Sequence, residues 1–258
     1  YYQVNDDFDS IAGLSQIMQA EAIRFAVETH RRNMPYCMGT LYWQFNDCWP
    51  VISWSSIDYG GNWKALHYAA RKFFSPLLVS MRDLDNKIEI HVVNDQHHEV
   101  ESEIRLGLFN FNGDTLFNDS SDIKVEPFSS VIYHTFEKDD LLGGSDSSAI
   151  VFRAELFVGG KVLSRAHQFF RRPKYLSIPS PEFDYEIERV SGKYVITVRS
   201  KSFLCQLHLI STKVRGLFSE NFFDMLPGEV QMIDFEPSEN KELKKSDLKV
   251  RTLFEMMN

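Results

Sequence analysis

The sequence predicts a mainly β protein in which two antiparallel β-sandwiches follow a short helix–strand–helix segment. From about Pro76 onward, apolar and polar residues alternate with period two, which is typical of half-buried strands. Before that point, apolar residues follow helical spacing on either side of a short, almost wholly apolar run at Gly39–Trp43. A proline-rich stretch at 173–181 divides the β part in two. We therefore expect domains at residues 1–75, 76–175 and 176–258.

The composition favours a folded protein and argues against two classes of partner. Of the 258 residues, 43% are hydrophobic and 14% aromatic, which is enough for a packed core. The 28 basic and 36 acidic residues give a net charge of −8 without a basic cluster, so no nucleic-acid partner is expected. No apolar run reaches the roughly 18 residues of a membrane helix, so no membrane partner is expected. Cys37, Cys48 and Cys205 match neither a zinc spacing nor a disulfide framework, and a Cys37–Cys48 bridge stays open.

The first segment opens with a predicted amphipathic helix. Asp9 or Ser10 can cap its N-terminus, and Pro35 cannot continue it. Arg31 and Arg32 suit its C-terminal end, where positive charge is favourable. The apolar residues expected to face the core are spaced three or four apart: Ile11, Leu14, Met18, Ala22 and Phe25.

A buried parallel strand and a second helix complete this predicted segment. The run Gly39–Trp43 is short and nearly all apolar, as in a strand that is covered on both faces. A single parallel strand cannot form a sheet, so we expect its neighbours upstream of Tyr1, in a longer protein. The second helix presents one apolar side: Trp63, Leu66, Ala70 and Phe73.

The β part reads as two sandwiches on either side of the proline-rich stretch. About seven strands are predicted in the roughly 100 residues before it, which is typical of an antiparallel sandwich. Turn residues such as Gly159 and Gly160 separate these strands. Shorter alternating runs after the linker predict a second, smaller sandwich. The clearest alternating runs are 88–92, 104–108, 150–158, 194–198 and 250–254.

All four tryptophans lie between positions 43 and 63, around a polar stretch that follows the predicted strand. In parallel α/β folds the loops after strand ends build the active site. An indole can stack on the apolar face of a sugar ring, and Asn46 and Asp47 can bind its hydroxyl groups. The alternative from the residues alone is a buried aromatic core in which Asn46 and Asp47 cap turns.

No metal site and no carboxylate pair for catalysis are predicted. His97 and His98 lie at an expected hairpin turn without a third ligand at a useful spacing. The acidic pair Asp139–Asp140 is interpreted as part of a turn.

Several motifs carry a family resemblance. Three of them are Gly-Thr-Leu-Tyr-Trp-Gln-Phe-Asn-Asp-Cys-Trp-Pro at 39–50, Ser-Trp-Ser-Ser-Ile-Asp-Tyr at 53–59 and Trp-Lys-Ala-Leu-His-Tyr at 63–68. They resemble the end of the catalytic barrel in β-mannosidases of glycoside hydrolase family 2. Pro173-Lys174 in the linker is similar to the same family, as is 216–222, where Glu220 stands for the family's aspartate. The resemblance spans essentially the whole chain.

The resemblance implies a TIM (β/α)8 barrel followed by two immunoglobulin-like β-sandwich domains. Residues 10–33 would be the seventh barrel helix, 38–43 the eighth strand and 62–74 the eighth helix. The parent would be a retaining, exo-acting enzyme that hydrolyses terminal non-reducing β-D-mannose residues without a cofactor or metal. The family's nucleophile and acid/base glutamates follow barrel strands that would precede Tyr1. We therefore expect no catalytic residue in this chain and no activity from the chain alone.

The resemblance also implies the binding residues and partners. It assigns Trp43 to a wall of the −1 sugar subsite, with Asn46 and Asp47 beside it, and a β-mannoside oligosaccharide or glycan as the substrate. The apolar sides of the barrel remnant should be frayed or covered by self-association. By resemblance alone, the parent would be periplasmic, secreted or lysosomal. The alternative function is a non-catalytic carbohydrate-binding or structural β-sandwich module, to which residues 1–75 are an attachment.

Overall fold

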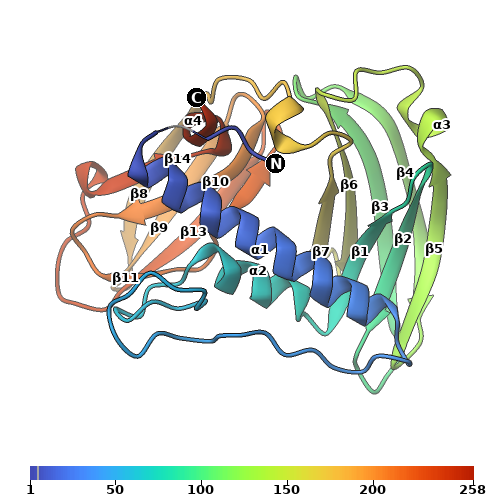
Figure 1. The fold of residues 1–258 in the computed structure, drawn as a ribbon, viewed down its shortest axis with the longest axis horizontal. Helices are drawn as coiled ribbons and strands as arrows, with labels where there is room; N and C mark the ends of the chain where they lie inside the picture. Colours follow the sequence, from blue (N-terminus) through green and yellow to red (C-terminus); the bar gives the residue numbers. More distant parts are fainter. Residues whose placement is uncertain (5) are drawn as a thin grey trace.

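The computed structural model describes residues 1–4 and 6–258, which form two β-sandwiches and a long helix that lies across both (Figure 1). The long helix is α1 (Phe8–Arg32), and the shorter helix α2 (Ala65–Phe73) packs beside it. One end of α1 lies near the second sandwich and helix α4 (Leu253–Met257), and the other end reaches the first sandwich. The helix thus ties both halves of the β part to the segment that precedes them.

The first sandwich has two antiparallel sheets, with strand orders β1-β2-β5 and β4-β3-β6-β7. Alternate side chains of both sheets, such as Val79, Ile90, Leu106 and Phe152, meet in one buried core. The prediction of an antiparallel sandwich of about seven strands is confirmed. Its elements are β1 (Leu77–Asp83), β2 (Lys87–Asn94), β3 (Val100–Asn110), β4 (Thr115–Val125), β5 (Ser129–Glu137), α3 (Lys138–Leu142), β6 (Ile150–Val158) and β7 (Lys161–Gln168).

The hairpin between β6 and β7 shows why the turn signal was reliable. Gly159 and Gly160 connect Val158 to its partner Lys161, and both have positive φ, at 58° and 77°. A two-residue turn with left-handed backbone at both positions matches the twist of the strands, and glycine adopts it without a steric penalty.

The second sandwich follows a linker that contains only a 3₁₀ turn, η1 (Pro173–Tyr175). Its sheets have the orders β11-β13-β9-β8 and β12-β10-β14, and Ile196, Leu207 and Phe235 are among its buried core residues. The predicted second sandwich is therefore confirmed. Its elements are β8 (Phe183–Val190), β9 (Lys193–Ser200), β10 (Leu204–Ser211), β11 (Gly216–Phe218), β12 (Phe223–Met225), β13 (Val230–Pro237), η2 (Lys245–Asp247) and β14 (Leu248–Arg251).

A further apolar cluster fills the junction between α1 and the two sandwiches. Leu14 and Ile17 of α1 share it with Phe111 from the first sandwich and Phe203 from the second. The rings of Phe111 and Phe203 stack with centroids 4.3 Å apart. The two sandwiches and the helix therefore share one continuous buried contact.

The predicted apolar stripe of α1 is wrong in most of its members. Only Leu14 of the predicted positions is buried, whereas Ile11, Met18, Ala22 and Phe25 are exposed. The buried apolar residues are Leu14, Ile17, Ala20 and Val27. The helix has apolar residues on two sides, and spacing alone does not tell which side meets the rest of this chain. The cap is also shifted, because Asp7, not Asp9 or Ser10, accepts the bond from the Ser10 amide, at 2.9 Å.

The predicted strand at 38–43 is absent from the structure. Residues 38–43 form no regular element, and Leu41 is 98% exposed. A parallel strand needs backbone hydrogen bonds from neighbouring strands, and no strand among the described residues pairs with this run. Helix α1 is one uninterrupted helix of 25 residues. Within the described part of the chain, no helix combines the length and apolar character that would let it span a membrane.

Candidate functional site

The candidate site is the tryptophan loop, which we define as residues 43–63, between the end of the apolar run and the start of α2. Two isolated bridges shape it: Asn46 pairs with Ile57, and Ile57 pairs with Trp63. The amide of Ile57 donates to the carbonyl of Phe45 at 2.9 Å, so the two ends of the loop lie side by side. The loop is therefore ordered by backbone hydrogen bonds although it contains no named strand or helix.

Three of the four indoles lie on the surface of this loop. Trp43 is 74% exposed, and Trp49 and Trp54 are also largely exposed. Trp63 is half-buried and packs edge-on against His67 and Tyr68 of α2, with the Arg71 guanidinium over its ring. The alternative of a buried aromatic core is thus wrong for the first three tryptophans and holds in part for the fourth.

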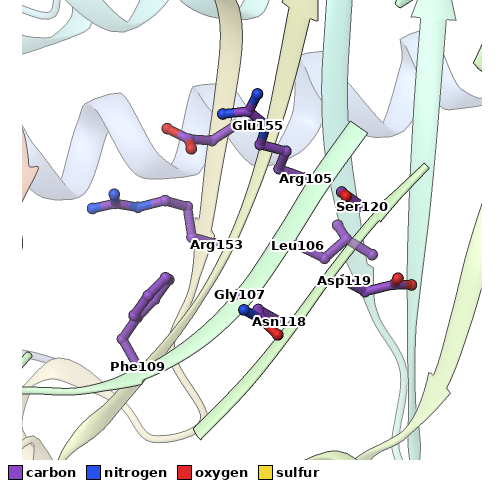
Figure 2. A pocket seen from close by; sticks show the side chains of 9 residues that line it. All are labelled: Arg105, Leu106, Gly107, Phe109, Asn118, Asp119, Ser120, Arg153 and Glu155. Carbon is purple, nitrogen blue, oxygen red and sulfur yellow. The ribbon is translucent and has the colours of Figure 1, made fainter. Parts of the chain in front are cut away.

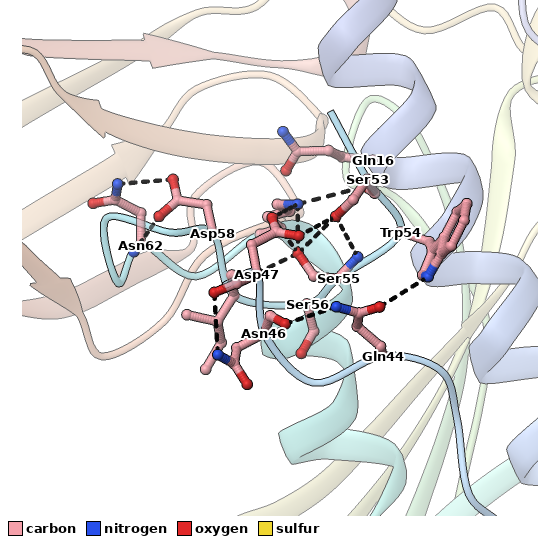
Figure 3. A network of polar contacts seen from close by, with 12 residues as sticks. Gln16, Gln44, Asn46, Asp47, Ser53, Trp54, Ser55, Ser56, Asp58 and Asn62 are labelled. Carbon is pink, nitrogen blue, oxygen red and sulfur yellow. Dashed lines mark hydrogen bonds and ion pairs between the residues drawn. The ribbon is translucent and has the colours of Figure 1, made fainter. Parts of the chain in front are cut away.

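Asp47 lies at the centre of a polar cluster inside the loop (Figure 3). Its Oδ1 accepts a hydrogen bond from Ser53 Oγ at 2.5 Å, and its Oδ2 accepts one from Ser55 Oγ at 2.7 Å. Lys64 Nζ lies 3.3 Å from Oδ2 and also donates to Ser55 Oγ at 2.8 Å. These donors hold the pKa of the Asp47 carboxyl below its usual value, with the two serine bonds as the largest cause.

Asn46 lies on the other side of the backbone and is exposed. Its Nδ2 donates to the carbonyl oxygen of Asp47 at 3.2 Å. The structure therefore separates the two neighbouring residues that we predicted as sugar ligands. Asn46 faces solvent, whereas the Asp47 side chain is only 2% exposed and bound by groups of its own chain.

Further contacts connect the loop to both helices. Gln44 Oε1 accepts from Trp54 Nε1 at 3.2 Å, and Gln19 of α1 donates to the Trp54 carbonyl at 2.7 Å. Ser56 Oγ lies 3.1 Å from His67 Nδ1 of α2, and burial lowers the pKa of that histidine. Helices α1 and α2 thus both hold the part of the loop that carries Trp54.

The residues that hold the loop are ones that sequence reasoning missed as functional. Ser53, Ser55 and Lys64 belong to motifs that we recognised, but a serine or lysine carries no signal that it will contact an aspartate elsewhere in a loop. The close spacing of Ser53 and Ser55 around Trp54 is the one hint in the sequence, since alternate side chains in an extended segment point the same way.

A second polar network lies between the two sandwiches. Arg153 of β6 binds Glu229 with both terminal nitrogens, at 2.5 and 3.2 Å, and its Nε donates to His167 Nε2 at 3.0 Å. Because an arginine Nε–H can only donate, His167 must carry its proton on Nδ1, which donates to Asp224 Oδ2 at 2.9 Å. Burial lowers the pKa of His167, consistent with a neutral ring. The network joins strands on opposite sides of the linker.

A shallow hollow of about 490 Å³ opens on the outward face of the sheet that contains β3, β4 and β6 (Figure 2). Its charged groups are largely paired within the protein: Arg105 binds Glu103 at 2.7 Å and lies over the Phe157 ring at 3.8 Å. The hollow is distant in sequence from the tryptophan loop. It lacks the exposed indoles that make the loop a candidate for sugar binding.

The chemistry available in the tryptophan loop is binding rather than bond cleavage. Its two carboxylates, Asp47 and Asp58, are both engaged inside the loop, the latter with Asn62 at 2.9 Å. Cys37, Cys48 and Cys205 are all free thiols, so the bridge that the sequence left open is not formed. Across residues 1–4 and 6–258, no group of three or more His, Cys, Asp or Glu side chains is placed to hold a metal ion.

Two family models match the β part of the chain. Residues 86–175 match the family model described as a mannosidase Ig/CBM-like domain, and residues 178–256 match the model of an Ig-fold domain. The first sandwich and the second sandwich correspond to these two matches.

Relatives and solved structures agree with the domain matches. The chain is 27% identical to β-mannosidase A of Aspergillus oryzae over 93% of its length, which is 29% of that protein. Over a shorter stretch of 80 residues, 28% of this chain and 9% of the relative, it is 49% identical to the β-mannosidase of Capra hircus. The crystal structure of β-D-mannosidase from Dictyoglomus thermophilum is 26% identical, superposes with a TM-score of 0.85, and covers 97% of this chain and 30% of that one. The chain therefore spans about 30% of the length of the Aspergillus oryzae and Dictyoglomus thermophilum proteins, which it matches over most of its own length.

Proposed function

We propose that this chain is the C-terminal region of a retaining, exo-acting β-mannosidase. The observation that carries the proposal is the match to β-mannosidases over 93% of the chain but only 29% of the relative. In this assignment residues 1–75 complete a (β/α)8 barrel, and the domains at 76–175 and 176–258 are the two sandwiches that follow it. The segment at 38–43 becomes the eighth barrel strand once its neighbouring strands are present.

The exposed apolar groups of the first segment support the same proposal. Phe25 and Met18 of α1, together with Leu41, lie on the surface of the described chain. Met18 and Phe25 are seven residues apart and so lie on the same side of α1, and exposed large apolar side chains that lie together mark a contact surface. In the parent this surface meets the remainder of the barrel, which supplies the sheet that 38–43 lacks.

The proposed reaction is hydrolysis of a terminal, non-reducing β-D-mannosyl residue with retention. One glutamate of the parent attacks the anomeric carbon, and the other protonates the leaving oxygen, with the carboxyl groups roughly 5–5.5 Å apart. Both glutamates come from the part of the barrel that precedes Tyr1. The tryptophan loop contributes Trp43 as a stacking face for the sugar and Asn46 as a hydrogen-bonding group beside it.

The test is kinetic, on the protein encoded by the complete reading frame. We expect kcat/KM on nitrophenyl β-mannoside to exceed that on the matched β-glucoside and β-galactoside, and the first product to be β-mannose. Comparable rates on all three glycosides would contradict the assigned sugar, and initial release of α-mannose would contradict retention.

A second candidate is a non-catalytic carbohydrate-binding module, favoured by the Ig/CBM-like match at 86–175. Its ligand would lie in the hollow of Figure 2, on the face that carries Arg105 and Asn118. Titration of the chain with mannan oligosaccharides separates the candidates. Binding that survives Trp43→Ala and is lost with Arg105→Ala would favour the module.

A further inference from the structure

We propose that Asp47 is a positioning residue: its buried carboxylate fixes the tryptophan loop and does not contact the sugar. The sugar-binding role of the loop rests on the proposed function, but the positioning role rests on contacts within this chain. The proposal gives different roles to two neighbouring residues that we predicted as sugar ligands from the sequence. Asn46 faces a ligand, whereas the Asp47 side chain points into the loop.

The contacts of Asp47 span the whole loop (Figure 3). Its two oxygens bind Ser53 and Ser55, which flank Trp54, so the carboxylate fixes the backbone on both sides of that indole. Lys64, at the start of α2, closes the cluster and also approaches the Ser53 carbonyl at 3.4 Å. One side chain thus connects the beginning of the loop, its tip and the helix that follows it.

The position of Trp43 depends on the same cluster through the backbone. Ser56, next to Ser55, donates its amide to the carbonyl of Gln44 at 3.0 Å. The side chain of Gln44 in turn accepts from Trp54. The residue directly after Trp43 is therefore held by the segment that Asp47 anchors.

The burial of Asp47 argues against a direct sugar contact. With both oxygens occupied and the side chain 2% exposed, a sugar hydroxyl could reach the carboxylate only by displacing Ser53, Ser55 or Lys64. Removing one partner from such a buried, charge-assisted cluster leaves the others unpaired, which is unfavourable. The Asp47 carboxylate therefore stabilises the loop and is not free to bind a sugar hydroxyl.

The first experiment is hydrogen exchange on this 258-residue chain. The amides of Asp47, Ser56, Ile57 and Lys64 donate across the loop and report its closure. We expect Asp47→Ala to speed exchange at these amides by at least about 10-fold while strands β3 and β6 stay unchanged. Asp47→Asn, which keeps one acceptor, should lie between Asp47→Ala and the wild type. It also serves as the test if the alanine variant does not fold.

The matched control is Asp58→Ala. Asp58 is in the same loop, but its carboxylate binds only Asn62 among the hydrogen bonds of the loop. We expect its effect to stay within the turn at 58–62. Exchange at the four reporting amides that is unchanged in both Asp47 variants, or changed equally by Asp58→Ala, would overturn the proposal.

The second experiment uses the parent enzyme and a double-mutant cycle. If Asp47 acts through the loop, Asp47→Ala should lower kcat/KM by about 10-fold or more, and by less than about 3-fold when Trp43→Ala is already present. Effects of Asp47→Ala and Trp43→Ala that multiply fully would show an independent contact and overturn the proposal. A parent without mannosidase activity would refute the proposed function, while the exchange data would still decide the role of Asp47.

Discussion

Helix α1 presents two apolar faces with opposite surroundings. The inner face, with Ile17 and Val27, packs against α2 and the junction of the two sandwiches and is almost fully buried. The outer face carries Phe25, which is 68% exposed, and Met18. Both faces are apolar, and only the contacts made within this chain tell them apart.

The two faces show which side of residues 1–75 packs against the β-sandwiches and which side is uncovered. The sandwiches, the linker and the inner face of α1 bury their apolar residues against one another. The Arg153–Glu229 ion pair also connects the two sandwiches. The outer face and the tryptophan loop have no such apolar cover in the described chain. One side of the segment therefore packs against the β-sandwiches, and the other is exposed, where we propose that the barrel contacts it.

The largest expected effect comes from neighbouring residues on the two faces. Ile17→Ala should lower the free energy of unfolding by about 2–5 kcal/mol, because it removes a side chain from the junction core and leaves a cavity. Met18→Ala, one residue along, should change it by less than about 0.5 kcal/mol. Urea denaturation of both variants measures the contrast, and equal losses would contradict the division of α1 into two faces.

The polar network between the sandwiches provides the next test. Arg153→Met leaves Glu229 without its charged partner and should cost about 2–3 kcal/mol, less than for a fully buried pair because Glu229 is 30% exposed. Arg105→Met is the control, since Arg105 forms an exposed pair with Glu103 and such pairs contribute little. If both variants unfold at the same urea concentration as the wild type, the network does not stabilise the contact.

Trp43→Ala in the parent enzyme tests the proposed sugar-binding role of the tryptophan loop. Loss of a stacking face should lower kcat/KM by an amount equivalent to about 1–3 kcal/mol, with part of the loss in kcat. The stability of the 258-residue chain should be unaffected, because Trp43 is on its surface. Unchanged kinetics in a folded variant would remove Trp43 from the sugar site.

Acid should lower the free energy of unfolding of the second sandwich through the buried His208. Burial lowers its pKa from 6.5 to about 4, where the ring stacks on Phe222. Between those values the unfolded chain binds a proton that the folded chain does not, so stability is lost as pH falls. We expect a loss of about 1 kcal/mol between pH 7 and 5.5 from this residue. His208→Gln should flatten that slope and His98→Gln, at an exposed position, should not; equal slopes in all three proteins would refute the assignment.

The sequence predicted the parts of the fold that depend on local pattern. Period-two runs and paired glycines located β3, β6 and the β6–β7 hairpin because strand alternation and turn geometry are set by neighbouring residues. The buried face of α1 and the state of residues 38–43 depend instead on distant partners. Pattern alone predicted a buried stripe and a strand there, and the described chain has neither as predicted.

The candidate site divides in the same way. The concentration of tryptophans and the motif around Asn46 were visible in the sequence, and three of the four indoles are exposed in the structure. The inward turn of Asp47 was not visible, because it depends on Ser53, Ser55 and Lys64 meeting in three dimensions. Two adjacent side chains of similar size and polarity can have different surroundings, and their sequence does not distinguish them.

The central claim is that residues 1–75 are one part of a catalytic domain whose carboxylates lie outside this chain. Release of nitrophenol from an aryl β-mannoside, measured for the purified 258-residue chain and for the complete protein under the same conditions, tests it most directly. We predict turnover by the complete protein and none by the chain, since its tryptophan loop has no free carboxylate pair. Turnover that follows the 258-residue chain through purification, with host enzyme excluded, would contradict the claim and place the catalytic carboxylates within this sequence.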